Sequence, residues 1–210
     1  MRVARVVTNE TCNQACRFCN ARRPRERASI AAAAAVRRRI ADAHRAGVHE
    51  LVLTGGEPTI RPDLLPLLRA AKSLGYRDIK LQTNALLLAP PANAPRLVAA
   101  GVTRFHVSIH THRPERYDAL VRRPGAYPSM VRGLAAAVAT GLPVVVEVIL
   151  KEDTYRDLPD ALRWLHARGV RQADLWFVSL TDANAAHPES MPRMTDVVPV
   201  MAEAFAFARA

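Results

Sequence analysis

The segment "CNQACRFC", residues 12–19, contains every cysteine of this 210-residue chain, at positions 12, 16 and 19. It follows closely on "RVARVV" (2–7), an apolar run of the length and composition of a buried strand. Three cysteines cannot all pair with one another, so a disulfide framework explains the cluster poorly. The cluster therefore predicts a chemical site at the end of the first strand, and the rest of the sequence indicates which fold surrounds it.

The spacing of Cys12, Cys16 and Cys19 leaves three explanations open. Soft thiolates are the usual ligands of iron–sulfur clusters, and three of them on a cubane would leave one iron without a protein ligand. A structural zinc ion would need a fourth ligand, for which His44 or His49 could be recruited. The third explanation is a chance grouping in a loop.

Apolar runs alternate with helical patterns six times, which predicts an α/β fold with a parallel sheet. The pattern does not choose between a barrel and an open doubly wound sheet, but in both the loops after the strands carry the site. We expect Ser29 to cap the first helix and Gly47 to end it. No linker or repeat divides the chain, so we expect one domain over residues 1–210. The expected strands are 2–7, 50–54, 78–83, 104–109, 143–150 and 173–180, and the expected helices are 29–47, 62–74, 91–100, 127–140, 157–168 and 195–209.

The composition restricts the class of protein. Half of the residues are hydrophobic, and no stretch approaches the roughly 18 apolar residues of a membrane span. The N-terminus lacks a secretory signal, so we expect a cytoplasmic protein. The net charge is +11, and all but three of the 30 basic residues are arginines. Few aromatic residues accompany these arginines, which disfavours a nucleic-acid substrate.

A second motif, "LTGGEPT" (53–59), follows the second expected strand. Gly55 and Gly56 would let the backbone come close to a ligand because they carry no Cβ. Glu57 offers a carboxylate to an ammonium group. The alternative is an ordinary strand-to-helix turn in which Pro58 opens the helix.

Together, the two motifs resemble those of the radical S-adenosylmethionine (radical SAM) enzymes, whose signature is Cys-x3-Cys-x2-Cys after the first strand of a partial (β/α)6 TIM-like barrel. The resemblance implies that Cys12, Cys16 and Cys19 hold three irons of a 4Fe–4S cluster, and that the amine and carboxylate of SAM chelate the fourth. It also implies that Phe18 lies near the adenine. In the family, a segment like Gly55-Gly56-Glu57 binds the amino group of SAM.

Later strands extend the resemblance. "LQTNA" (81–85) is similar to the Thr-Asn-Gly of the family, with Ala85 in place of the glycine, and implies that Asn84 contacts SAM. A period of two places His106, Ser108 and His110 on one strand face, where Ser108 would meet the SAM ribose. Glu147 interrupts a run of valines and would reach SAM, or else pair with an arginine.

The catalytic residues beyond the cofactor site are not determined by these motifs, and His110 and Glu147 are the candidates. We expect Arg122 and Arg123 to be solvated or structural. The arginines at 22, 23, 25 and 27 are expected in a solvated loop, with docking of an acidic electron carrier as the alternative. The stretch 181–196 is expected to form a partial lid, with His187 as a candidate site residue.

The implied activity is reductive cleavage of SAM to methionine and a 5′-deoxyadenosyl radical, which abstracts hydrogen from an unidentified substrate. A peptide or secondary metabolite is favoured as substrate over RNA, and a flavodoxin or ferredoxin is the expected electron donor. The alternative is a truncated or degenerate cluster-binding barrel that acts as a partner subunit without turnover.

Overall fold

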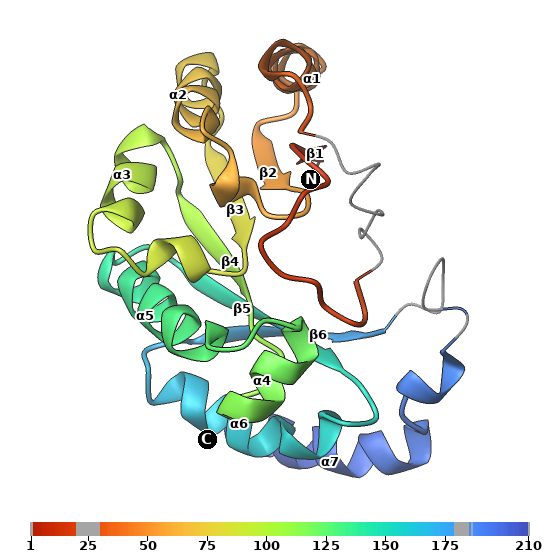
Figure 1. Cartoon of the computed structure of the whole chain (residues 1–210). Coiled ribbons are helices and arrows are strands. Elements are labelled where there is room, and N and C mark those ends of the chain that lie inside the picture. Colours follow the sequence, from red (N-terminus) through yellow and green to blue (C-terminus); the bar gives the residue numbers. More distant parts are fainter. Residues whose placement is uncertain (1, 20–29, 179–184, 186, 210) are drawn as a thin grey trace.

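The computed structural model describes residues 2–19, 30–178, 185 and 187–209. Ser29, the arginines at 22, 23, 25 and 27, and residues 181–184 and 186 of the expected lid lie outside the described residues. Six parallel strands form one sheet, as the sequence predicts, and their order is β1-β2-β3-β4-β5-β6 (Figure 1). The strands are β1 (Val3–Val7), β2 (Glu50–Thr54), β3 (Asp78–Thr83), β4 (Arg104–Ser108), β5 (Val144–Leu150) and β6 (Gln172–Phe177).

The strand order decides between the two folds that the sequence left open. A doubly wound sheet reverses its strand order at a switch point, whereas this order is sequential from one edge to the other. Right-handed crossovers then place every connecting helix on the same side. Figure 1 shows the helices arrayed around the outside of a curved fan of strands. The sheet is therefore a partial (β/α)6 barrel with β1 and β6 as its edges.

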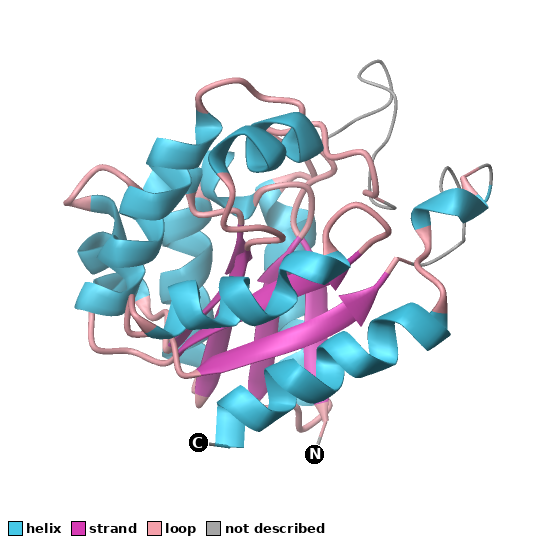
Figure 2. Ribbon diagram, turned by 90° about the horizontal axis from the view of Figure 1, so that it is seen from below, coloured by secondary structure: helices cyan, strands magenta, loops and turns pink. Residues whose placement is uncertain are grey.

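Seven α-helices and four short 3₁₀ turns connect the described strands and follow the last one, and Figure 2 shows them packed along the sheet. Helix α1 begins at Ala33, with Ala32 rather than Ser29 at its N-cap position, while Gly47 follows its end with φ +79° as predicted. One helix, α4, was not expected from the sequence. The helices are α1 (Ala33–Arg45), α2 (Leu64–Leu74), α3 (Asn93–Ala100), α4 (Pro114–Val121), α5 (Ala126–Ala139), α6 (Leu158–His166) and α7 (Met194–Arg209), and the turns are η2 (Pro58–Ile60), η3 (Leu86–Leu88), η4 (Tyr155–Asp157) and η6 (Pro188–Ser190).

Alternate residues of each strand pack against the helices and form the core, with Leu51, Leu81 and Phe105 fully buried. The opposite, concave face carries polar side chains. Paired residues of neighbouring strands point to the same face, and the register pairs Ser108 with Glu147. The fold therefore leaves a polar concave surface beside the carboxyl ends of the strands. Among the described residues, no helix has the length and apolar character needed to cross a bilayer.

Candidate cofactor site

The cysteine loop, which we define as residues 8–19, runs directly against the Gly-Gly-Glu segment. It continues the pairing of β1 with β2, because the Thr8 N–H donates to the Thr54 carbonyl (2.8 Å). The Gly56 N–H then donates to the Asn9 carbonyl (2.7 Å), and the Glu57 N–H donates to the Thr11 carbonyl (2.9 Å). The two motifs that carry the resemblance are therefore one continuous backbone structure.

The two glycines are needed for this contact. A Cβ on Gly55 would lie 2.4 Å from the Asn9 carbonyl oxygen, and a Cβ on Gly56 would lie 2.0 Å from that of Thr11. The sequence suggested that the glycines admit a ligand. In the structure, the glycines instead let the backbone of the cysteine loop come close. Any other residue at these two positions would displace that loop.

Glu57 is a buried carboxylate held by uncharged hydrogen-bond donors. Its side chain accepts hydrogen bonds from the Thr59 N–H (3.0 Å) and hydroxyl (2.6 Å), the Thr83 hydroxyl (2.7 Å) and the Asn84 N–H (2.7 Å). Burial raises its pKa, and these hydrogen bonds oppose the rise. No described Lys, Arg or His lies within ion-pair distance of it. A buried carboxylate in this state fits an ammonium ligand, as the resemblance implies for SAM.

Asn84 connects Glu57 to the cysteine loop. Its backbone N–H binds Glu57, while its side-chain amide donates to the Asn13 side-chain oxygen (2.7 Å) and lies 3.8 Å from the Cys12 sulfur. Ala85, which replaces the glycine of the family pattern, adopts a left-handed conformation (φ +63°). The turn that presents Asn84 therefore has the shape expected for the glycine, although it carries a methyl group.

The three cysteines lie in one loop, and none of them forms a disulfide bond. Cys12 as a whole is exposed, yet its thiol lies close enough to surrounding protein that burial raises the thiol pKa to about 11. The hydrogen bond from the Gln14 N–H acts in the opposite direction and lowers this pKa. Within the described ranges, no three His, Cys, Asp or Glu side chains are placed to share one metal ion. A single zinc ion would need its ligands to converge within about 2.0–2.3 Å of it. Thiolates that each bind a different iron of a cubane need no such convergence.

Polar residues of β3, β4 and β5 meet on the concave face around Glu147. Glu147 accepts from Gln82 (2.6 Å) and lies within hydrogen-bond range of His106 Nδ1 (3.3 Å) and the Ser108 hydroxyl (3.4 Å). Burial raises the pKa of Glu147, but these hydrogen bonds and nearby positive charge outweigh it and lower the pKa overall. Among the described residues its nearest basic partner is His106, and Arg5 binds Gln82 instead (3.0 Å), so the alternative of an arginine pair is not seen there.

His110 lies on the same face as Ser108, one step nearer the barrel mouth. Its Nδ1 accepts the Ile149 N–H (3.2 Å), and its ring meets the Phe18 ring edge-to-face at 4.6 Å. Burial lowers the pKa of His110 to about 4, so the imidazole is neutral at pH 7. The structure thus brings the rings of Phe18 and His110 into contact at the mouth of the barrel. His187 is exposed, pairs with Glu189 and joins none of these groups.

Helix α4 supports the cysteine loop from the other side, which sequence reasoning missed. The Ala15 and Arg17 N–H groups donate to the Val121 and Leu120 carbonyls (3.0 and 3.2 Å), which lie at the end of α4 and lack partners within the helix. Two side-chain contacts add to them: the Arg123 guanidinium donates to the Asn13 carbonyl, and Gln14 donates to the Tyr117 hydroxyl (3.0 Å). Arg123 is therefore structural, one of the two roles expected for it.

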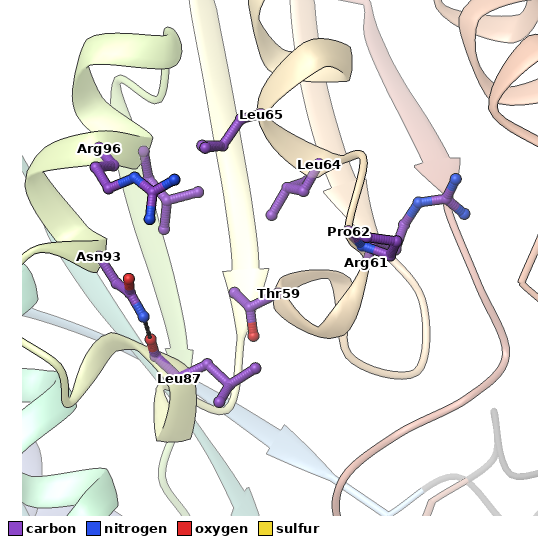
Figure 3. Close-up of a pocket in the computed structure, with 9 residues that line it drawn as sticks. Thr59, Arg61, Pro62, Leu64, Leu65, Leu87, Asn93 and Arg96 are labelled. Carbon is purple, nitrogen blue, oxygen red and sulfur yellow. Dashed lines mark hydrogen bonds between the residues drawn. The ribbon is translucent and has the colours of Figure 1, made fainter.

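A shallow pocket of about 160 Å³ lies beyond Glu57, between α2 and α3 (Figure 3). Four leucines contribute the apolar part of its wall together with Pro62, and Thr59, Asn93 and Arg96 add polar groups. Neither Glu57 nor the cysteines line it. Arg61 contributes to the wall, but its guanidinium points away from the pocket, toward the end of β1. The pocket therefore touches the cofactor site through Thr59 but contains neither its carboxylate nor its cysteines.

Comparison with known proteins agrees with this geometry. The Radical SAM superfamily profile matches residues 6–165, about three quarters of the chain. The chain belongs to the radical SAM superfamily. Members of this superfamily are enzymes that use a 4Fe–4S cluster and SAM, and solved neighbours of this fold contain bound AdoMet.

Sequence relatives of this radical SAM chain include probable GTP 3′,8-cyclase from Methanopyrus kandleri, 35% identical over 76% of this chain and 51% of the relative. GTP 3′,8-cyclase from Heliobacterium modesticaldum is 36% identical over 79% of this chain and 53% of the relative. The chain thus spans about half the length of these curated relatives.

Solved radical SAM structures share the fold at low identity. Streptococcus suis SuiB bound to precursor peptide SuiA has a TM-score of 0.80 at 17% identity, covering 99% of this chain and 46% of that one. The structure of anSMEcpe with bound AdoMet and a Kp18Cys peptide also has a TM-score of 0.80, at 12% identity over 98% of this chain and 59% of that one. At these identities the likeness concerns the fold alone.

Proposed function

We propose that this chain is the SAM-cleaving barrel of an active radical SAM enzyme. The observation that carries the proposal is Glu57, a buried carboxylate with no described cation within ion-pair distance, fixed by direct backbone contact beside the cysteine loop. Cys12, Cys16 and Cys19 would hold three irons of the cluster. When bound, the reduced cluster supplies the electron that cleaves SAM to methionine and a 5′-deoxyadenosyl radical.

The chain's own residues bind and orient SAM. Glu57 would receive the SAM ammonium, because its four hydrogen-bond donors fix the carboxylate and leave its charge unpaired. Asn84 holds Glu57 and Asn13 at a fixed separation. On the concave face, Ser108 and Glu147 are proposed to contact the ribose side, and Phe18 to pack beside the adenine. The neutral His110 lies against Phe18 and would exclude water there.

We infer that the substrate is a purine nucleotide of the GTP class. The support is the identity of 35–36% to relatives named GTP 3′,8-cyclases, across about three quarters of this chain. This inference replaces the peptide or secondary metabolite favoured from sequence, which rested on the absence of auxiliary features alone.

The test is anaerobic reconstitution with iron and sulfide, followed by addition of SAM and dithionite and quantification of 5′-deoxyadenosine by mass spectrometry. We expect 5′-deoxyadenosine from the wild type and none from Cys16→Ala, which lacks one cluster ligand. A fully loaded wild-type cluster that yields no 5′-deoxyadenosine would favour the degenerate-barrel alternative.

The substrate inference has its own readout in the same assay. Addition of GTP should raise the yield of 5′-deoxyadenosine and deplete GTP in step with it, whereas CTP should do neither. If SAM is cleaved but GTP changes nothing, the nucleotide inference is wrong and the cofactor chemistry stands.

A further inference from the structure

Arg61 binds both ends of the cysteine-bearing connection between β1 and α1. Its side chain is almost fully buried, with 1% of it exposed. One guanidinium nitrogen donates to the Thr8 carbonyl, directly after β1, and to the Ala31 carbonyl (2.8 Å), directly before α1. These two carbonyls mark the beginning and the end of the connection that carries Cys12, Cys16 and Cys19.

Two further donors of Arg61 bind a carboxylate. Nε and the second terminal nitrogen bind the two carboxylate oxygens of Asp63 at 2.9 and 2.7 Å, a bidentate pair. This pair neutralises the guanidinium and fixes the plane in which it reaches the two carbonyls. Figure 3 shows the group turned toward the end of β1 rather than toward the other pocket residues. The charge of Arg61 is therefore paired with Asp63 within the protein, and Arg61 is not assigned to an anionic ligand.

The same short segment carries Glu57. The η2 turn begins at Pro58, and its first N–H, that of Thr59, donates to the Glu57 side chain. The Arg61 N–H closes the turn by donating to the Pro58 carbonyl (3.0 Å). Glu57 and Arg61 thus lie at the two ends of one hydrogen-bonded turn. A shift of Arg61 would be transmitted to the position of the cysteine loop relative to Glu57.

We propose that Arg61 is a positioning residue that joins the two ends of the connection between β1 and α1. It thereby holds the cysteine loop in register with Glu57 before any cofactor binds. Bringing two chain segments more than twenty residues apart together costs loop entropy, which the Arg61 contacts and the Asn9–Ile30 bridge offset. The planar fork of arginine suits this task, because a lysine ammonium cannot hold a carboxylate bidentately while it reaches two carbonyls. The cluster-related part of this proposal rests on the proposed function; the loop closure does not.

The first test uses the metal-free protein, so that it is independent of SAM cleavage. Amide hydrogen exchange of peptides covering residues 8–19 would be compared in wild type, Arg61→Met and Arg96→Met, with circular dichroism as the folding control. Arg96 is an exposed arginine of the same pocket and is the matched control. We expect at least about 10-fold faster exchange of these peptides in Arg61→Met, and no change in Arg96→Met. Wild-type exchange in a folded Arg61→Met would overturn the proposal.

Arg61→Lys covers the case in which Arg61→Met does not fold. It keeps the buried charge but lacks the fork, so we expect a folded protein with exchange intermediate between the other two. Wild-type exchange in Arg61→Lys would show that the fork is not needed and would likewise overturn the proposal. After reconstitution, the change in the cluster EPR spectrum on adding SAM should be diminished in Arg61→Lys and retained in Arg96→Met. A normal EPR response in Arg61→Lys would contradict the coupling to Glu57.

Discussion

At the scale of single residues, the charge of Glu57 is the feature that the fold leaves uncompensated. Replacement by glutamine keeps its size but removes the charge, and an amide would also present N–H groups to the Asn84 N–H donor. A charge-assisted hydrogen bond contributes about 1.5–3 kcal/mol, so Glu57→Gln should weaken SAM binding on the order of 10- to 100-fold. Calorimetric titration of SAM into the reconstituted protein measures this change.

The pH dependence of SAM binding tests the same assignment. Burial raises the pKa of Glu57, so protonation competes with the ammonium at a higher pH than for an ordinary glutamate. SAM affinity in the wild type should therefore fall as pH is lowered through the raised pKa, and this fall should be absent in Glu57→Gln. The same acid dependence in both proteins would assign it to another group.

Gly56 is the second residue whose identity the structure explains. A Cβ there would meet the Thr11 backbone, which cannot yield as a side-chain end can, so Gly56→Ala should cost roughly 1–3 kcal/mol and displace the cysteine loop. Gly141→Ala is the control, because it meets no atom within 4 Å and carries only the strain of φ +75°. Thermal unfolding should shift in both variants, but bound iron should fall only in Gly56→Ala. Equal iron content in Gly56→Ala and Gly141→Ala would contradict the role assigned to the contact between Gly56 and the Thr11 backbone.

At the scale of secondary-structure elements, α4 is a support for the cysteine loop. Arg123 and Arg122 are exposed neighbours at its end, and only Arg123 donates to Asn13. Arg123→Ala should leave the melting temperature of the metal-free protein nearly unchanged but shorten the lifetime of the bound cluster, by about 5-fold for a loss of about 1 kcal/mol. Arg122→Ala should have neither effect. The measurement is iron release to a chelator over time. Equal release from the two variants would show that Arg123 does not support the cysteine loop.

Sequence patterns predicted the strands because each is a short apolar run between turn residues, and they predicted the cofactor motifs because cysteine and glycine spacing is local. They did not predict α4, since "PERYDALV" has only eight residues and buries just Tyr117, Leu120 and Val121. Arg61 was missed for a different reason. Its partners at Thr8 and Ala31 are backbone carbonyls far away in sequence, and no residue pattern marks such a contact.

At the scale of the whole molecule, the net charge of +11 should steer acidic partners toward the protein. Reduction by an acidic flavodoxin or ferredoxin would then slow as salt rises, because the Debye length falls from about 30 Å at 0.01 M to about 8 Å at 0.15 M ionic strength. Small-molecule reduction by dithionite depends on no protein–protein docking and serves as the reference. Steering of this kind typically changes association rates by about 10-fold or more.

The place of docking can be separated from the total charge by two variants with the same charge change. Arg17 is an exposed arginine inside the cysteine loop, whereas Arg96 is exposed on α3 beside the pocket. If an acidic donor approaches over the cysteine loop, Arg17→Glu should lower the stopped-flow rate of cluster reduction at low salt several-fold, and Arg96→Glu should lower it much less. Because both variants lose the same charge, an equal decrease would mean that the donor responds only to the overall field. The arginines around the cysteine loop would then have no specific part in electron delivery.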